Sequence, residues 1–253
     1  MNGRKPYRPD LSALQPEFRR IERRLMLRGA LSLGALSLLG GCGELDSDDA
    51  VDCVLRDMLS FNDRVQAWLF SRNRLARIFP ASAITKPFPF NAYYPPSEIR
   101  TVDPAQWRLE LSGLIENKKP WSLRDLRALP QQSQITRHIC VEGWSAIGSW
   151  SGVPLSLFLK RVGADLRAKY VEVKCFDDYF TSIDMETALH PQTILALDYA
   201  DETLPPEYGA PMKIRMPTKL GYKNPKYVSA IGVTNTYPGG YWENQGYDWF
   251  GGS

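Results

Sequence analysis

The sequence has few residues of the kinds that hold metals or electron carriers in proteins. Its 253 residues include four cysteines and two histidines. It has no Cys-x-x-Cys-His motif for covalent haem, no cysteine set for an iron–sulfur cluster and no Gly-x-Gly-x-x-Gly dinucleotide fingerprint. A structural zinc site needs four Cys or His ligands at regular spacings, and the chain has no such set. Any redox activity would therefore exchange electrons with a partner protein.

A charge excess of one sign is also missing from most of the chain. The formal net charge is +3, but residues 1–28 carry eight basic and three acidic residues, and residues 29–253 carry 23 basic and 25 acidic ones. Non-specific nucleic-acid binding requires a basic surface that displaces counterions from phosphates. We therefore expect no nucleic-acid partner.

The front end lacks an apolar run long enough to cross a bilayer comfortably. Arg23-Arg24 precede an apolar stretch over residues 29–41, which is shorter than the about 20 residues of a membrane-spanning helix. Basic residues, an apolar stretch and a small-residue site form the plan of an export signal, which we expect over residues 1–41. "RRLMLR" resembles the twin-arginine export signal, which carries folded and often cofactor-loaded proteins.

The end of this signal resembles the lipid-attachment site of bacterial lipoproteins. In "LLGGC" the cysteine is Cys42, which would carry the lipid and tether the protein in the periplasm. Two alternatives are an ordinary signal that is cleaved near Cys42 and a permanent signal-anchor helix.

Residues 42–80 are expected to form a tether followed by a helical segment. "GELDSDDAVD" is polar, and residues 51–79 then place apolar side chains at three- and four-residue spacing. We expect an amphipathic packing helix here rather than a membrane-binding one, with a break or cap at Asn62-Asp63 and an end at Pro80.

Residues 81–253 are expected to form one mixed α+β domain. A Pro-rich loop covers residues 80–105. Alternating or apolar patterns predict strands within 107–115, 133–144, 169–176, 192–200, 204–217 and 226–237, and short helices within 121–129, 154–163 and 185–190. Many strands with short interspersed helices are typical of the α+β class.

The segment "RHICVEGW" places a cysteine beside a histidine and an acidic residue. Because side chains two apart on a strand point the same way, His138 and Cys140 share a face. The residues alone leave four interpretations of Cys140 open: a buried core thiol, a disulfide with Cys175 or Cys53, a thiol nucleophile, and one thiolate ligand of a soft metal whose other sulfurs come from a cofactor.

A basic segment near the end of the chain indicates an anion site. Lys213 and Arg215 alternate with apolar residues, so both cations face one way on a strand. Lys219, Lys223 and Lys226 follow in a Gly-Asn-Pro loop whose backbone N–H groups also suit an anion. A single lysine is more often a solvated surface residue, but the cluster favours binding of a phosphate.

The segment "RHICVEGWSAIGSWSGVPLSLFL" resembles the molybdopterin-binding oxidoreductases of sulfite-oxidase fold. Within them it is most similar to the branch that contains the catalytic subunit of periplasmic protein-methionine-sulfoxide reductase. The resemblance covers residues 84–235. It implies a sulfite-oxidase-type molybdopterin-binding fold with mixed β-sheets, one pterin per molybdenum, Cys140 as the protein's ligand to the metal and Glu142 as a catalytic acidic residue beside it.

The resemblance also implies a set of cofactor contacts. "NAYY" matches a loop that grips the pterin, and the basic segment matches one that holds its phosphate. Three positions depart from the family pattern, because a lysine replaces an arginine at 213, a tyrosine replaces an asparagine at 208 and a cysteine replaces a threonine at 175. The expected cofactor-binding residues are Asn91, Tyr93, Tyr94, His138, Cys140, Cys175, Tyr208, Lys213, Asn224, Pro225 and Lys226.

The function that the resemblance implies is two-electron oxygen-atom transfer on a sulfur-type substrate, a sulfoxide or a sulfite-like compound. The substrate would be a small molecule or a protein sulfoxide, the electron partner a membrane cytochrome b or a c-type cytochrome, and the protein a monomeric catalytic subunit. The alternatives are a cofactor-free member of the fold that binds a partner or ligand, and a thiol enzyme based on Cys140. The aromatic tail "GYWENQGYDWFGGS" would either wall the site or pack in the core, and His190 is expected to be structural.

Overall fold

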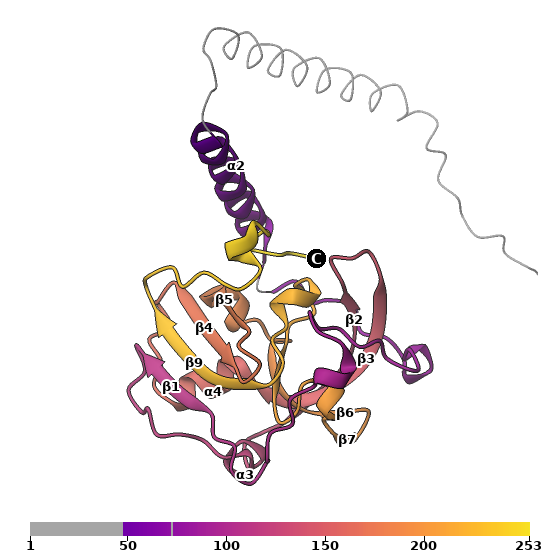
Figure 1. Ribbon diagram of the computed structural model, residues 1–253. Coiled ribbons are helices and arrows are strands. Elements are labelled where there is room, and N and C mark those ends of the chain that lie inside the picture. The colour runs from indigo at the N-terminus through magenta and orange to yellow at the C-terminus, as the bar shows by residue number, and fades with distance from the viewer. Residues whose placement is uncertain (1–47, 72) are drawn as a thin grey trace, which may run out of the picture. The chain divides into compact units, whose positions relative to one another are not determined.

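The computed structural model describes residues 48–71 and 73–253 (Figure 1). Residues 57–253 form one compact unit. The predicted export signal and Cys42 lie outside the described residues, as does the side chain of Cys53. The division of the chain at residues 41 and 80 stays a prediction. Within the described ranges we find no helix that is long and apolar enough to cross a membrane.

The first sheet has four strands in the order β1-β9-β4-β5. They are β1 (Glu110–Gly113), β9 (Val228–Thr234), β4 (Tyr170–Cys175) and β5 (Phe180–Asp184). β1 runs parallel to β9, whereas β9, β4 and β5 pair antiparallel. The burial of β4 alternates along the strand, as expected for a strand with one face on the core.

The second sheet contains the strands that carry the predicted cysteine and cation positions. It pairs β2 (Gln132–Ile139), β3 (Ser145–Pro154), β6 (Ile194–Tyr199) and β7 (Glu202–Thr203) in that order, and β8 (Lys213–Arg215) pairs with β6. β3 bulges between Ser151 and Gly152. Gly152 is required there because a Cβ atom would lie 1.9 Å from the carbonyl oxygen of Leu195.

Short helices complete the unit: α3 (Leu123–Arg127), α4 (Leu155–Arg161) and α5 (Met185–Ala188). Ser122 and Asp125 form a capping box at the start of α3, and Asp184 caps α5. A large core cluster includes fully buried Phe158, Val171 and Ile231, and a smaller one is built around Phe88 and Trp150. The mixed α+β class with short helices is confirmed.

Besides the two-residue β7, two strands were not predicted, β3 and β5. β3 is buried on both faces over most of its length and is rich in Ser and Gly, so its sequence "SAIGSWSGVP" shows no polar alternation. β5 follows β4 across a tight turn in which Asp178 adopts a positive φ of 66°. Both strands form because they pair with neighbouring strands of their sheets, and their local sequence pattern does not indicate a strand.

The predicted helix over 51–79 is wrong at its end and in its role. A single helix, α2 (Asp48–Leu69), continues through Asn62-Asp63 without a break. The chain beyond Asn73 then joins the edge of β2, where Phe79 N–H donates to the carbonyl of Ile135 at 3.0 Å. The packing role is wrong as well, because the apolar side chains Met58, Phe61 and Trp68 are exposed.

Candidate functional site

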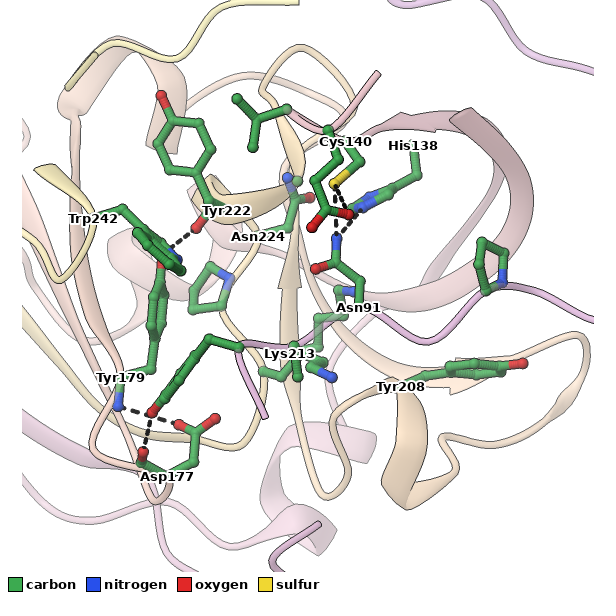
Figure 2. A pocket seen from close by; sticks show the side chains of 18 of the residues that line it. Asn91, His138, Cys140, Asp177, Tyr179, Tyr208, Lys213, Tyr222, Asn224 and Trp242 are labelled. Carbon is green, nitrogen blue, oxygen red and sulfur yellow. Dashed lines mark hydrogen bonds between the residues drawn. The ribbon is translucent and has the colours of Figure 1, made fainter. Parts of the chain in front are cut away.

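A cavity of about 260 Å³ opens beside Cys140 and gathers most of the predicted site residues (Figure 2). The end of β2, the loop before Tyr93, the start of β8 and the loop over 221–226 form its walls. The predicted residues that line it are Asn91, Tyr93, His138, Cys140, Glu142, Tyr208, Lys213, Asn224, Pro225 and Lys226. The structure therefore brings these residues, which come from segments far apart in the chain, to one cavity.

Cys140 is held in place by a turn directly after β2. Its N–H donates to the carbonyl of Trp144 at 2.9 Å, and Gly143 N–H donates back to its carbonyl at 3.1 Å. Gly143 has a φ of 93°, which favours glycine. The thiol is buried and free. Burial raises the pKa of the Cys140 thiol, and the neighbouring Glu142 charge raises it further.

This environment argues against a thiol nucleophile. Reactive cysteines have a lowered pKa that supplies the thiolate, and the pKa of Cys140 is raised instead. A bound metal cation stabilises a thiolate strongly enough to remove the proton. The disulfide with Cys175 is wrong, because both cysteines are free.

Asn91 contacts both side chains that β2 directs into the cavity. Its amide nitrogen lies 3.2 Å from Nε2 of His138 and 3.8 Å from Sγ of Cys140 (Figure 2). Burial lowers the pKa of His138 well below 6.5, and the nearby Arg215 and Lys213 charges lower it further, so the ring is neutral. Its Nδ1 atom is buried without a hydrogen-bond partner among the described residues.

Glu142 places a carboxylate next to the thiol. Its Oε2 atom lies 3.6 Å from Sγ of Cys140 and accepts a hydrogen bond from the Trp144 indole at 3.0 Å. The residue is exposed, so the carboxylate faces both the cavity and solvent.

A basic cluster is formed by Lys213 and Lys226, which line the cavity, and by Arg215, which is buried and does not line it. The Lys213 ammonium is 4.7 Å from the Trp150 ring centroid and the Arg215 guanidinium is 6.0 Å from it, which confirms that both face the same way. Burial and the neighbouring cations lower the pKa of Lys213 well below 10.5, and burial lowers the pKa of Lys226 to about 8.

The charges of Lys213 and Arg215 are poorly compensated, whereas the carboxylates of Asp177 and Glu207 partly offset the charge of Lys226. Among the described side chains, no carboxylate forms an ion pair with Lys213 or Arg215, and Arg215 donates to Asn224 Oδ1 at 2.9 Å and to the Arg137 carbonyl at 2.6 Å. Buried cations that lower one another's pKa are stabilised when an anion binds among them. The cluster is therefore suited to a phosphate.

Two predicted members of the anion site do not belong to it. The Lys219 ammonium donates to the Phe250 carbonyl at 2.8 Å and lies over the Phe250 ring. The Lys223 ammonium pairs with Glu243 and donates to the Ser182 carbonyl at 2.7 Å. Both lysines are buried against the tail, and neither lines the cavity.

Tyr94 and Cys175 also lie outside the cavity lining. Tyr94 donates to Asp177 Oδ2 at 3.0 Å, so it supports the wall indirectly. Cys175 is part of the large hydrophobic core cluster, so the thiol at this position is a core residue and not a second sulfur in the cavity. Tyr208 does line the cavity, with its hydroxyl on the Phe88 carbonyl at 3.0 Å.

Sequence reasoning missed several lining residues, among them Asp177, Tyr179 and Tyr222. Asp177 lies in an Asp-Asp turn directly after β4. Because functional side chains often lie in loops at the ends of strands, this pair of acidic residues could have been predicted as part of the site. In the tail, Trp242 and Tyr247 line the cavity, whereas the other aromatics pack elsewhere. Tyr241 stacks on Tyr93, Trp249 donates to Ser182 and Phe250 is buried against Phe70.

His190 has the structural role that the sequence predicted. Its Nε2 atom lies 3.2 Å from the carbonyl of Arg74, and its Nδ1 atom accepts from Gln192 N–H at 3.1 Å. Within the described residues no group of three or more His, Cys, Asp or Glu side chains could hold a metal ion.

Comparison with known proteins identifies a shared domain. Residues 96–242 match the model of the oxidoreductase molybdopterin binding domain. The chain is 64% identical over 231 residues to a protein-methionine-sulfoxide reductase subunit named YedZ1 from Azospira oryzae, and the match covers 91% of this chain and 88% of that protein.

More distant relatives share the same domain. The chain is 30% identical over 158 residues to the protein-methionine-sulfoxide reductase catalytic subunit MsrP of Burkholderia mallei, covering 56% of this chain and 48% of that protein. The crystal structure of the sulfane dehydrogenase SoxCD from Paracoccus pantotrophus superimposes with a TM-score of 0.51 at 21% identity, over 55% of this chain and 40% of that chain. This last likeness concerns the fold alone.

Proposed function

We propose, from the premise that the chain belongs to the family of the oxidoreductase molybdopterin binding domain, that it is an exported enzyme that reduces a sulfoxide by two-electron oxygen-atom transfer. The chain is a molybdopterin-dependent oxidoreductase related to protein-methionine-sulfoxide reductase. The sulfoxide substrate is supported by the names of these relatives, and export is supported by the twin-arginine pattern of residues 23–28.

The residues of the cavity fit a molybdenum cofactor with one pterin. Cys140 is the one thiol that lines the cavity, and no group of three or more His, Cys, Asp or Glu side chains among the described residues could hold a metal, so it suits a metal whose other sulfurs come from a pterin. Lys213, which forms no ion pair among the described side chains, and Lys226 both line the cavity and suit the pterin's phosphate. Cys140 would hold the metal, and Lys213, Lys226 and the Asn224-Pro225 backbone would hold the anionic end.

When bound, the cofactor would supply two-electron redox chemistry of the oxygen-atom-transfer type. The chain supplies position and protons. The turn over 140–144 fixes the sulfur of Cys140, and the Asn91 amide orients it by a weak hydrogen bond at 3.8 Å. Burial of the thiol keeps bulk water away from the metal ligand.

Protons are required because a sulfoxide, two electrons and two protons give a thioether and water. The Glu142 Oε2 atom lies 3.6 Å from the Cys140 sulfur and reaches solvent, so it can take protons from water and release them inside the cavity. Trp144 holds this carboxylate in place by its 3.0 Å hydrogen bond.

Electrons would come from a separate protein, since the sequence has no motif for haem or an iron–sulfur cluster. A membrane cytochrome b or a c-type cytochrome in the periplasm fits this need. Lipid attachment at Cys42 would hold a monomeric catalytic subunit near such a membrane partner.

The observation that carries the proposal is that the buried thiol of Cys140 and the cations of Lys213 and Lys226 line one cavity. Its test is metal analysis of protein made in a molybdenum-replete host. Wild type should contain about one molybdenum per chain, with sulfoxide reduction by an artificial electron donor, and Cys140→Ser should lose both.

Cys175→Ser is the matched control, because it changes the other buried free thiol in the core and should keep the metal. Folded wild type without molybdenum would overturn the proposal and favour a cofactor-free binding protein. A metal-loaded enzyme that acts on N-oxides or sulfite but on no sulfoxide would overturn the substrate class alone.

A further inference from the structure

The part of the helix α2 from residue 57 onward contacts the rest of the unit 57–253 through polar side chains. Asn62 donates to Asp248 Oδ2 at 3.0 Å and Gln66 donates to the same oxygen. The carboxylate of Asp63 accepts from the Phe250 N–H at 2.9 Å, and Gln66 Oε1 accepts from Gly252 N–H at 3.1 Å. For the part of α2 whose side chains the structure describes, these contacts determine which side of the helix faces inward.

The neighbouring side of the helix is apolar and exposed. Trp68 is 82% exposed, Phe61 63% and Met58 61%. Met58, Phe61, Val65, Trp68 and Leu69 follow three- and four-residue spacing, so they form one continuous line, the apolar stripe. Soluble helices normally turn such a line toward the core, and α2 does the reverse.

The exposed apolar surface continues into the segment after the helix. Leu75 is 57% exposed and Ile78 60%. Seven of the thirteen large hydrophobic residues that are exposed in the described chain fall between Met58 and Ile78. This concentration distinguishes a patch from the scattered apolar residues of an ordinary surface.

The segment is held firmly in this position. Ala76 N–H donates to Gln192 Oε1 at 2.7 Å, and Gln192 donates back to the Ala76 carbonyl at 3.0 Å. Phe79 N–H bonds to the edge strand β2, and Ile78 pairs with Thr136. The exposure of the apolar residues is therefore built into the fold.

Arginines border the apolar patch. The guanidinium groups of Arg77 and Arg137 lie 4.9 Å and 5.4 Å from the centroid of the Phe79 ring. Together with Arg74 they line a second cavity of about 570 Å³ that also contacts Leu69 and Leu75. Residues 57–79 carry four arginines and two aspartates. One of these aspartates, Asp63, is turned inward.

We propose that residues 58–71 and 73–78 together with Arg137 form a surface that binds an anionic phospholipid membrane. The apolar stripe would enter the boundary between headgroups and acyl chains, and Arg74, Arg77 and Arg137 would bind lipid phosphates. Trp and Phe on one side of a helix with flanking arginines are typical of helices that lie in the membrane interface. Arginines next to such a helix bind anionic lipid.

The chain that precedes the helix supports a lipid occupant rather than a soluble protein. The apolar stretch over 29–41 ends seven residues before the first residue of α2, and it follows a strongly basic segment. Two consecutive segments of the chain thus combine arginine with apolar residues. A bilayer can bind both, whereas a soluble protein partner would have to match each of them separately.

The test uses the full chain with its cofactor and vesicles of phosphatidylglycerol or phosphatidylcholine. The emission of Trp68 is obtained as the difference between wild type and Trp68→Phe. In phosphatidylglycerol vesicles this component should shift to shorter wavelength and be quenched about twofold or more by brominated acyl chains. The component of Trp121, which packs against the core, is the control and should not change.

Substitutions test the two parts of the surface separately. Phe61→Ser with Trp68→Ser should weaken vesicle binding about tenfold or more, while Leu114→Ser, at an exposed apolar residue outside the patch, should have no effect. Arg74→Gln with Arg77→Gln should weaken binding to phosphatidylglycerol and reduce its salt dependence.

Two outcomes would overturn the proposal. Vesicle-bound protein in which Trp68 stays accessible to iodide in water would show that the preceding apolar stretch alone binds the membrane. A patch that is protected in native membranes but not on pure lipid vesicles would show that its occupant is a membrane protein.

Discussion

The side-chain amide of Asn91 lies 3.8 Å from the sulfur of Cys140, so a loop outside both sheets supplies the hydrogen-bond donor for the thiol at the end of β2. The same amide nitrogen lies 3.2 Å from His138. One residue thus links the two side chains that the strand directs into the cavity.

Asn91→Ala is expected to lower molybdenum content and sulfoxide reduction about 10- to 100-fold, because side chains that orient a metal ligand typically contribute this much. Molybdenum per chain by mass spectrometry measures the effect. The exposed Asn117→Ala is the control and should match wild type. Equal metal content in Asn91→Ala and Asn117→Ala would mean that the amide does not orient the thiol.

Gly221→Ala tests how tightly the cavity is built around these residues. An added Cβ atom would lie 2.8 Å from Nε2 of His138 and 2.9 Å from the Asn91 amide nitrogen. We expect the free energy of unfolding to fall by about 1–3 kcal/mol. We also expect the folded variant to hold less cofactor than wild type, which a loss of stability alone would not cause. Urea unfolding and metal analysis on the same sample separate the two effects, and full metal content would contradict the expectation.

Glu243→Ala is expected to destabilise the protein by about 3–5 kcal/mol, because it leaves the buried Lys223 ammonium without its counter-charge. Glu243 also accepts a hydrogen bond from Thr181 at 2.6 Å. Urea unfolding measures the free energy of unfolding of Glu243→Ala and of the double variant Glu243→Leu/Lys223→Met, and the two values are compared. The double variant should recover much of the loss, and a double variant as unstable as the single one would show that the ion pair is not the cause.

Asp63 should make the attachment of α2 depend on pH. Burial and a hydrogen bond with Asp248 raise the pKa of Asp63 from 3.8 to about 7. Between these values the folded protein holds a proton that the unfolded chain releases. The stabilisation is therefore complete below pH 3.8 and is lost as the pH rises to about 7.

Amide hydrogen exchange over residues 61–69 measures this attachment. Protection in wild type should fall between pH 4 and pH 8 after correction for the intrinsic exchange rate, since ionised Asp63 and Asp248 repel each other. Asp63→Asn should abolish the fall, and Asp57→Asn, at an exposed position of the same helix, should keep it. An unchanged fall in Asp63→Asn would assign the effect to another group.

The sequence predicted those elements in which the local pattern reflects burial. β4 and α3 were both predicted from their local sequence pattern. The burial of β4 alternates, and Ser122 and Asp125, which the prediction did not use, cap the start of α3. β3 was missed because a strand buried on both faces shows no alternation. The end of α2 was missed because apolar residues continue at the same spacing after Leu69, although the chain there pairs with β2.

The site shows the same division between local and distant information. Cys140, Asn91 and Lys226 were found through short motifs. Lys223 and Lys226 are three residues apart in one loop, yet Lys223 is buried against the tail and Lys226 lines the cavity. The difference arises because the C-terminal tail packs back on this loop and places Glu243 beside Lys223 and Trp242 in the cavity wall. No local sequence pattern shows that the tail packs there.

The position of β9 at the centre of the first sheet determines when this protein can fold during its synthesis. β9 pairs with β1 on one side and β4 on the other, and Glu110 lies opposite Ala230. Until the ribosome has released β9, β1 has no partner in this sheet and the apolar face of β4 lacks its neighbour. The cavity wall needs Trp242 and Tyr247, which emerge later still. Loading of a cofactor must therefore follow translation, and the nascent chain needs protection from aggregation until then.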